Sequence, residues 1–221
     1  MTRTHWAAVV AVVLALLFAG AATVASAGGG GDSATAATPT ADSADAGFAR
    51  DMAVHHQQAV EMSFIVRDGT QDEEVRRLAY DIANTQANQR GMMLGWLDLW
   101  GLPKVAADRE PMAWMAGDAK GGHGGHGGTG HQAEDGSLMP GMATKADVER
   151  LDKAVGKQAE IEYLQLMIVH HNGGISMAKG CVELCTVGAE RDLAAGMVAA
   201  QESEVALMVD LLHKRGADAR S

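Results

Sequence analysis

Apolar residues recur at three- and four-residue steps along four stretches of the chain, which is the spacing of an amphipathic helix. The stretches cover about residues 48–69, 72–100, 144–179 and 189–214. Gly69, Gly101 and Gly216 stand where three of these helices should end. We expect Gly173-Gly174 to weaken the third helix. No stretch alternates convincingly as a strand does, so the sequence predicts an all-α protein.

The chain contains an internal repeat. Residues 48–101 align without a gap with residues 163–216, so that residue n pairs with residue n + 115. Each copy is a helical hairpin, and two such hairpins would bury their apolar faces against each other as a four-helix bundle over residues 47–216. The connection over residues 104–143 is long enough to permit a crossover between the hairpins.

The N-terminal residues have the pattern of a secretory signal. Arg3 precedes an apolar run from Trp6 to Val24, and Ala25-Ser26-Ala27 forms a small-residue cleavage site. We expect residues 1–27 to be removed, with an uncleaved membrane anchor as the alternative. Either outcome predicts an exported protein, in the periplasm, the cell envelope or the extracellular space. Residues 28–46, rich in Gly, Ala, Ser and Thr, read as a flexible linker.

The composition narrows the class of ligand. The chain has a formal charge of −10 and no cluster of Lys and Arg, which argues against nucleic acid as a partner. It has nine His and thirteen Met among 221 residues but only two Cys. We expect metal ions as partners, no membrane contact unless the N-terminal segment is retained, and leave protein partners open.

Each hairpin begins with the same motif, Met-x-x-His-His-x5-Met. Its members are Met52, His55, His56 and Met62 in the first copy, and Met167, His170, His171 and Met177 in the second. Positions i, i+3, i+4 and i+10 fall near one face of a helix. The two faces could meet in one site or form two separate sites.

Thioether and imidazole ligands together favour a soft metal. Cu(I) accepts Met sulfur, Cu(II) accepts imidazole, and Ag(I) should resemble Cu(I), whereas zinc rarely binds Met. No Glu-x-x-His motif occurs, which argues against a di-iron centre. Met at helical spacing is often only core filling. However, both drifted copies keep the same His and Met, which favours a ligand role.

Other residues are weaker candidates. His123, His126 and His131 lie in the glycine-rich stretch Gly121–His131, which could bind metal weakly or be a solvated linker. Gln86 and Gln201 could orient the imidazoles. Cys181 and Cys185 should form a disulfide outside the cytoplasm, which would kink or end the third helix. Alternatively, Cys181 extends the ligand face of Met177.

The residues Phe48–Met62, Met139-Pro-Gly-Met142 and Leu166–Met177 resemble the signatures of a bacterial domain-of-unknown-function family. Its copper-binding, CopM-like members have a ferritin-like four-helix fold. The resemblance covers about residues 46–216 and implies a periplasmic or extracellular role in copper tolerance. It also implies metal ligands at ten positions: Met52, His55, His56, Met62, Met139, Met142, Met167, His170, His171 and Met177.

The leading hypothesis is an exported protein that binds Cu(I), Cu(II) or silver through Met and His, for metal sequestration or tolerance. The first alternative is a copper-dependent redox enzyme, which we disfavour because the repeat offers no clear catalytic base. The second is a metal-free helical adaptor. Thermal stability that does not change with copper would favour the adaptor.

Overall fold

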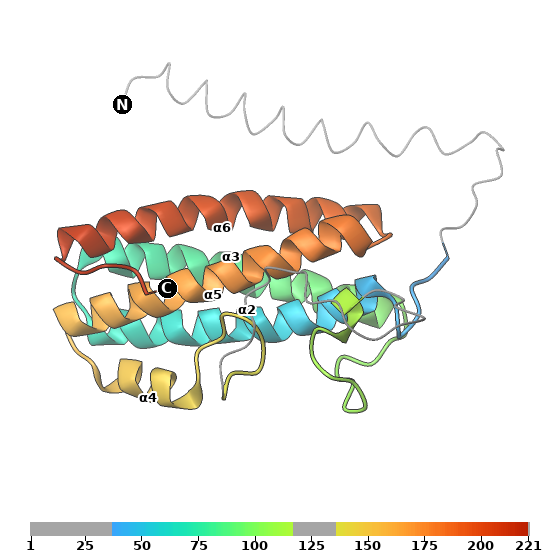
Figure 1. The fold of residues 1–221 in the computed structure, drawn as a ribbon, viewed down its shortest axis with the longest axis horizontal. Coiled ribbons are helices and arrows are strands. Elements are labelled where there is room, and N and C mark those ends of the chain that lie inside the picture. Colours follow the sequence, from blue (N-terminus) through green and yellow to red (C-terminus); the bar gives the residue numbers. More distant parts are fainter. Residues whose placement is uncertain (1–36, 117–135, 221) are drawn as a thin grey trace, which may run out of the picture. The chain divides into compact units, whose positions relative to one another are not determined.

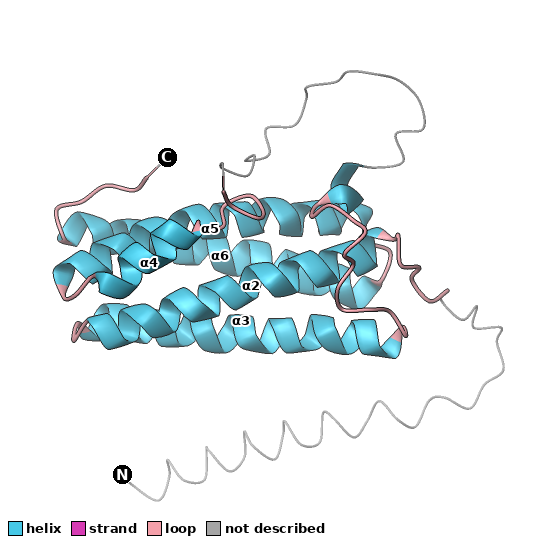
Figure 2. Cartoon of the chain, turned by 90° about the horizontal axis from the view of Figure 1, so that it is seen from below, coloured by secondary structure: helices cyan, strands magenta, loops and turns pink. Residues whose placement is uncertain are grey.

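The computed structural model describes residues 37–116 and 136–220, and this part of the chain is entirely α- and 3-10-helical apart from its loops. Its elements are α2 (Ala44–Gly69), α3 (Glu73–Leu99), the 3-10 helix η1 (Ala113–Ala116), α4 (Lys145–Lys153), α5 (Lys157–Leu184) and α6 (Gly188–Lys214). The four long helices α2, α3, α5 and α6 lie along one another (Figures 1 and 2). One short turn joins α2 to α3 and another joins α5 to α6, so that the four helices form two hairpins. The predicted signal segment lies outside the described residues, as do His123, His126 and His131.

Side chains cap the N-termini of three helices. Ser43 accepts a hydrogen bond from the Ala46 amide, and Asp72 accepts one from the Val75 amide. Thr144 and Asp147 form a reciprocal capping box at the start of α4, where the sequence predicted an N-cap. The first helix starts at Ala44, within the predicted linker over residues 28–46, because Ser43 supplies its N-cap. The polar composition of this stretch did not indicate a helix start.

The prediction of one helix over residues 144–179 was wrong, because this stretch forms two helices. Residues 154–156 separate α4 from α5, with Ala154 extended and Gly156 at φ +56°. Such a positive φ favours glycine, and the Gly156 amide donates to the Gly69 carbonyl at 2.7 Å. The expected weakening at Gly173-Gly174 is also wrong, since α5 runs unbroken from Lys157 to Leu184.

Two apolar clusters fill the interior between the long helices. The first includes Val66 of α2, Leu78 of α3, Tyr163 of α5 and Leu212 of α6, and Leu151 of α4 packs into it. The second includes Phe48, Leu97, Ala178 and Met197 from the same four long helices. On every long helix, polar residues separate the positions that belong to the two clusters. A polar layer therefore crosses the protein between its two apolar halves.

Candidate metal centre

The polar layer consists of two residues from each long helix: His55 and His56 of α2, Gln86 and Gln89 of α3, His170 and His171 of α5, and Gln201 and Glu204 of α6. All four histidines are at most 1% exposed. The rings of His55 and His170 are in contact, with their centroids 3.8 Å apart and their planes tilted by 37°. The structure thus brings the histidine pairs of the two repeats together at the centre of the helices.

Three of the histidines have a fixed tautomer. The Nε2 atoms of His55, His56 and His171 face the Pro140 carbonyl at 3.3 Å, the Gln89 Oε1 at 2.8 Å and the Glu204 Oε2 at 2.7 Å. Each partner is an oxygen that can only accept, so Nε2 carries the proton and donates. The lone pair of each ring is then on Nδ1, as a metal-binding imidazole requires.

The polar layer has a marked excess of unsatisfied hydrogen-bonding groups. Among the described residues, twelve buried side-chain N and O atoms have no partner, and eight of them belong to this layer. These eight are Nδ1 of His55, His56, His170 and His171, Nε2 of His170, both amide atoms of Gln86, and Oε1 of Gln201. Buried groups of this kind are costly unless a ligand or ion satisfies them.

Burial keeps the imidazoles of His55, His56 and His170 neutral. Desolvation, with a smaller contribution from neighbouring histidines, lowers the pKa of His55 to about 3 and that of His56 to about 4. The pKa of His170 is shifted downward for the same two reasons. A neutral imidazole keeps its lone pair, so these rings can bind a cation at neutral pH without first losing a proton.

Methionines from both repeats border the polar layer on each side. Met62 and Met167 belong to the first apolar cluster, and Met52 and Met177 to the second. Each side therefore has one motif Met from α2 and one from α5, which follows from the pseudo-symmetry of the repeat. All four are fully buried, and Met139 of the central motif also belongs to the second cluster.

The Met139–Met142 segment packs directly on the histidines through two close backbone approaches. The Pro140 carbonyl is the partner of His55, and Gly141 adopts φ +77°. A Cβ on Gly173 would collide with that same Pro140 carbonyl, and a Cβ on Gly174 would lie 2.6 Å from the Gln201 Oε1. The glycine pair of α5 therefore makes room for the segment and for the layer, while Met142 remains only partly buried.

A side-chain amide fixes the same segment to α2. Gln58 donates to the Ala143 carbonyl at 2.9 Å and accepts from the Ala143 amide at 2.7 Å. The Gln58 side chain thereby satisfies both backbone hydrogen-bonding groups of Ala143 and fixes the backbone at this residue. Gln58 follows the motif histidines by less than one helical turn, so it holds the Met139–Met142 segment beside the polar layer.

Sequence reasoning missed two residues of the layer. Gln89 and Glu204 orient His56 and His171, and they occupy equivalent positions of the repeat. They were not predicted because their side chains differ between the two copies of the repeat. Gln86 and Gln201 are identical in both copies, so the sequence predicted the orienting role for them instead. Gln86 has no hydrogen-bond partner among the described residues, and neither does the Gln201 Oε1.

The two cysteines form a disulfide, which the sequence favoured over a ligand role. Cys181 and Cys185 are bonded at the C-terminal end of α5, and Cys185 is the residue that caps this helix. In this form Cys181 has no thiolate to offer a metal. The expectation that the bond would end the helix agrees with the position of the cap.

No three His nitrogens or carboxylate oxygens of the polar layer lie close enough together to share one ion, within the ranges 37–116 and 136–220. Thioether sulfur from the bordering methionines would complete the coordination of a soft ion bound by two of these imidazoles. Two or three ligands of this kind suit Cu(I) and Ag(I) better than ions that demand oxygen.

These features define an all-α protein with a buried His-rich layer between methionine-bordered cores. Residues 45–212 match the family model described as Domain of unknown function (DUF305), and the chain belongs to this family. Among curated proteins, no sequence matches the chain. Within the described residues, no helix has the length and apolar character needed to cross a membrane.

Solved structures show the same fold. A DUF305 protein of Streptomyces coelicolor, described as a candidate secreted protein, is 63% identical, with 82% of this chain and 99% of that chain covered and a TM-score of 0.71. A DUF305 fragment from Deinococcus radiodurans is 27% identical, with coverage of 77% and 96% and a TM-score of 0.60. CopM in its Cu(I)-bound form is 18% identical, with coverage of 77% and 96% and a TM-score of 0.55. CopM structures with Cu(II) and with silver also match.

Proposed function

We propose that this protein binds copper, as Cu(I) or Cu(II), or silver, and that the ion is its cargo rather than a catalytic cofactor. The observation that carries the proposal is the set of four buried histidines whose Nδ1 atoms have no partner among the described residues. Buried polar atoms without a partner cost free energy in the metal-free protein, and a bound ligand would offset that cost. A cation that accepts imidazole nitrogen is the simplest ligand of this kind.

The proposed ligands are those implied by the two repeats and the central motif: Met52, His55, His56, Met62, Met139, Met142, Met167, His170, His171 and Met177. Imidazole and thioether together match Cu(I) and Ag(I), and imidazole alone matches Cu(II). Because Met sulfur adds no charge and does not titrate, the site keeps its affinity wherever the imidazoles are neutral. The hydrogen bonds from Nε2 would hold the rings in the binding tautomer.

Similarity to CopM supports this proposal through the fold only. Structures of CopM hold Cu(I), Cu(II) and silver, but CopM is 17–23% identical to this chain. We propose on this basis that the helices form a ferritin-like four-helix domain over residues 47–216. We also propose that residues 1–27 direct export and are removed, that residues 28–46 link to the domain, and that the protein sequesters metal in the periplasm, the cell envelope or outside the cell.

Titration of the purified protein with Cu(I), in competition with a chromogenic chelator, tests the function. We expect tight binding that is lost when His55, His56, His170 and His171 are all replaced by Ala. The matched control is His213→Ala, because His213 lies exposed on α6. Unchanged stoichiometry in the fourfold variant would disprove the assignment, provided that its helical circular dichroism is retained.

A further inference from the structure

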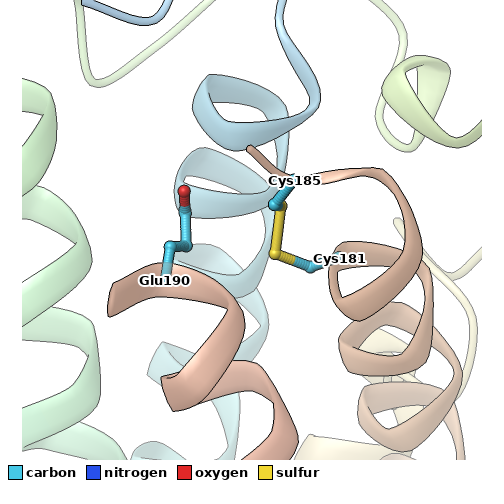
Figure 3. A group of neighbouring side chains, drawn as sticks. All are labelled: Cys181, Cys185 and Glu190. Carbon is cyan, nitrogen blue, oxygen red and sulfur yellow. A yellow bond between two sulfur atoms is a disulfide. The ribbon is translucent and has the colours of Figure 1, made fainter. Parts of the chain in front are cut away.

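A second group of metal-binding side chains lies where α5 turns into α6, outside the polar layer. Cys181 of α5, the α5 C-cap residue Cys185 and Glu190 of α6 lie close together there (Figure 3). One ligand atom from each residue lies within 4.8 Å of the other two, and all three side chains are buried. The group thus combines two sulfurs with a carboxyl group in the buried interior.

Glu190 is difficult to explain as a structural residue. Its side chain is completely buried, and neither carboxyl oxygen makes a hydrogen bond of good geometry. Burial first, and then the charge of the adjacent Asp45 and a side-chain hydrogen bond with it, raise the pKa of Glu190 to about 9. Asp45 also accepts hydrogen bonds from Thr186 and Val187. An apolar side chain would fill the position of Glu190 without the cost of burying a carboxyl group.

The disulfide also contributes little to the stability of the fold. It joins residues four apart in the sequence, and the stabilisation from a cross-link grows with the length of the loop that it closes. The α5–α6 turn is already fixed by the three hydrogen bonds to Asp45. The pair therefore contributes less to stability than a bond between distant segments would.

We propose that reduction turns this group into a second metal site, in which the thiolates of Cys181 and Cys185 and one carboxylate oxygen of Glu190 hold a thiophilic cation such as Zn(II), Cd(II) or Cu(I). The Cα atoms of the cysteines are 4.8 Å apart, so both sulfurs can reach one ion. The site lies at the C-terminal end of α5, where helix carbonyls favour a cation. It uses no residue of the polar layer and does not depend on copper binding there.

The chemistry of the switch balances with an external reductant. A dithiol transfers two electrons and two protons to the disulfide, which becomes two thiols while the dithiol becomes a disulfide. The incoming cation then displaces both thiol protons and the proton of Glu190, and these three protons go to solvent. In the reverse direction an external disulfide accepts two electrons by thiol–disulfide exchange and becomes a dithiol, while Cys181 and Cys185 re-form their bond; this removes two of the three ligands and releases the ion.

Cadmium binding by the full chain tests the proposal, because thiolate-to-cadmium charge transfer gives a distinct ultraviolet band. Oxidised protein and protein reduced with a dithiol, then freed of reductant under anaerobic conditions, are dialysed against the same Cd(II) solution. We expect the reduced form to hold one more Cd(II) per chain and to show the band. Any Cd(II) in the polar layer contributes to both forms and cancels in the difference.

Two variants make the test specific. In Cys181→Ser/Cys185→Ser the difference between the two treatments should vanish. In Glu190→Gln, which keeps both cysteines, the reduced form should bind Cd(II) at least tenfold more weakly. Equal Cd(II) content in the oxidised and reduced wild-type protein overturns the proposal. Equal affinity of wild type and Glu190→Gln also overturns it, because unfolded cysteines would bind without regard to Glu190.

Discussion

At the scale of single residues, the buried histidines make stability depend on pH. A histidine in an unfolded chain has a pKa of about 6.5, whereas His55 and His56 have folded pKa values of about 3 and about 4. Between these values the unfolded chain binds more protons than the folded protein. The metal-free protein should therefore be fully stabilised above pH 6.5 and lose stability progressively as the pH falls toward 4.

Chemical denaturation of the metal-free protein between pH 7.5 and pH 4 measures this dependence. We expect His55 and His56 each to contribute a loss of about 3 kcal/mol at the acid end, and a smaller total loss after His56→Leu. The exposed His213 supplies the control, since His213→Leu should leave the slope unchanged. A free energy of unfolding that does not change over this range would contradict the burial of neutral imidazoles.

The residues that orient the rings should affect metal affinity without touching the metal. Glu204 accepts the Nε2 hydrogen of His171 at 2.7 Å, and replacing it with Ala removes the group that fixes this tautomer. We expect Glu204→Ala to weaken Cu(I) binding about 10- to 100-fold. Glu202→Ala is a matched control, because Glu202 lies exposed on the same helix and pairs with Lys179. Equal affinities of the two variants would contradict the orienting role.

At the scale of elements, the glycine pair of α5 lets the Met139–Met142 segment reach the histidines. Helix propensity alone predicts that Gly→Ala in a helix stabilises by about 1 kcal/mol. At Gly173 the new Cβ collides with the Pro140 carbonyl, a backbone atom that cannot rotate away. We therefore expect Gly173→Ala to displace the segment, lower the melting temperature and weaken Cu(I) binding.

Gly196→Ala provides the comparison, because nothing lies within 4 Å of the position that its Cβ would occupy on α6. This variant should gain stability, as propensity predicts, and bind Cu(I) as the wild type does. Thermal melts and Cu(I) titrations of the two variants together separate packing from propensity. A stabilised Gly173→Ala protein with normal binding would show that the segment is not held against α5.

The long helices could be predicted from the sequence because apolar spacing and glycine or capping residues mark their ends. The break at residues 154–156 could not, since Ala154 and Val155 continue the apolar pattern and only the backbone of Gly156 reverses the chain. The two histidine pairs could be predicted as candidate ligands, because both copies of the repeat carry His-His at the same position. Their contact with Pro140 was not, because it joins residues 85 apart through a backbone carbonyl.

At the scale of the whole molecule, a polar network joins the two hairpins at one end of the helices. Arg215 of the α6 C-cap forms a buried ion pair with Glu160 of α5 and a second with Asp72, while the Thr70 hydroxyl donates to Glu160 at 2.6 Å. This network ties both hairpins together about Glu160. It lies at the opposite end of the helices from the disulfide, so the layer is bordered by fixed structure on both sides.

A ligand that fills the layer should stabilise the folded protein as a whole. Binding to the native state alone adds about 2.7 kcal/mol when free ligand is at 100 times its dissociation constant. We expect the melting temperature to rise with Cu(I) under anaerobic, chelator-buffered conditions that leave the Cys181–Cys185 disulfide intact, and to stay constant in the variant that lacks all four buried histidines. Differential scanning calorimetry over a series of buffered Cu(I) concentrations makes the measurement. No rise in the wild-type protein would favour a metal-free helical adaptor.

X-ray absorption at the copper edge of the Cu(I)-loaded protein tests the proposed ligand set most directly, with Cys181 and Cys185 kept as the disulfide. The scattering should contain both sulfur, which can then come only from methionine, and the multiple-scattering pattern of imidazole. Replacement of the four buried histidines should remove the imidazole pattern. A first coordination shell of oxygen alone, or one that these replacements leave unchanged, would contradict copper binding in the polar layer.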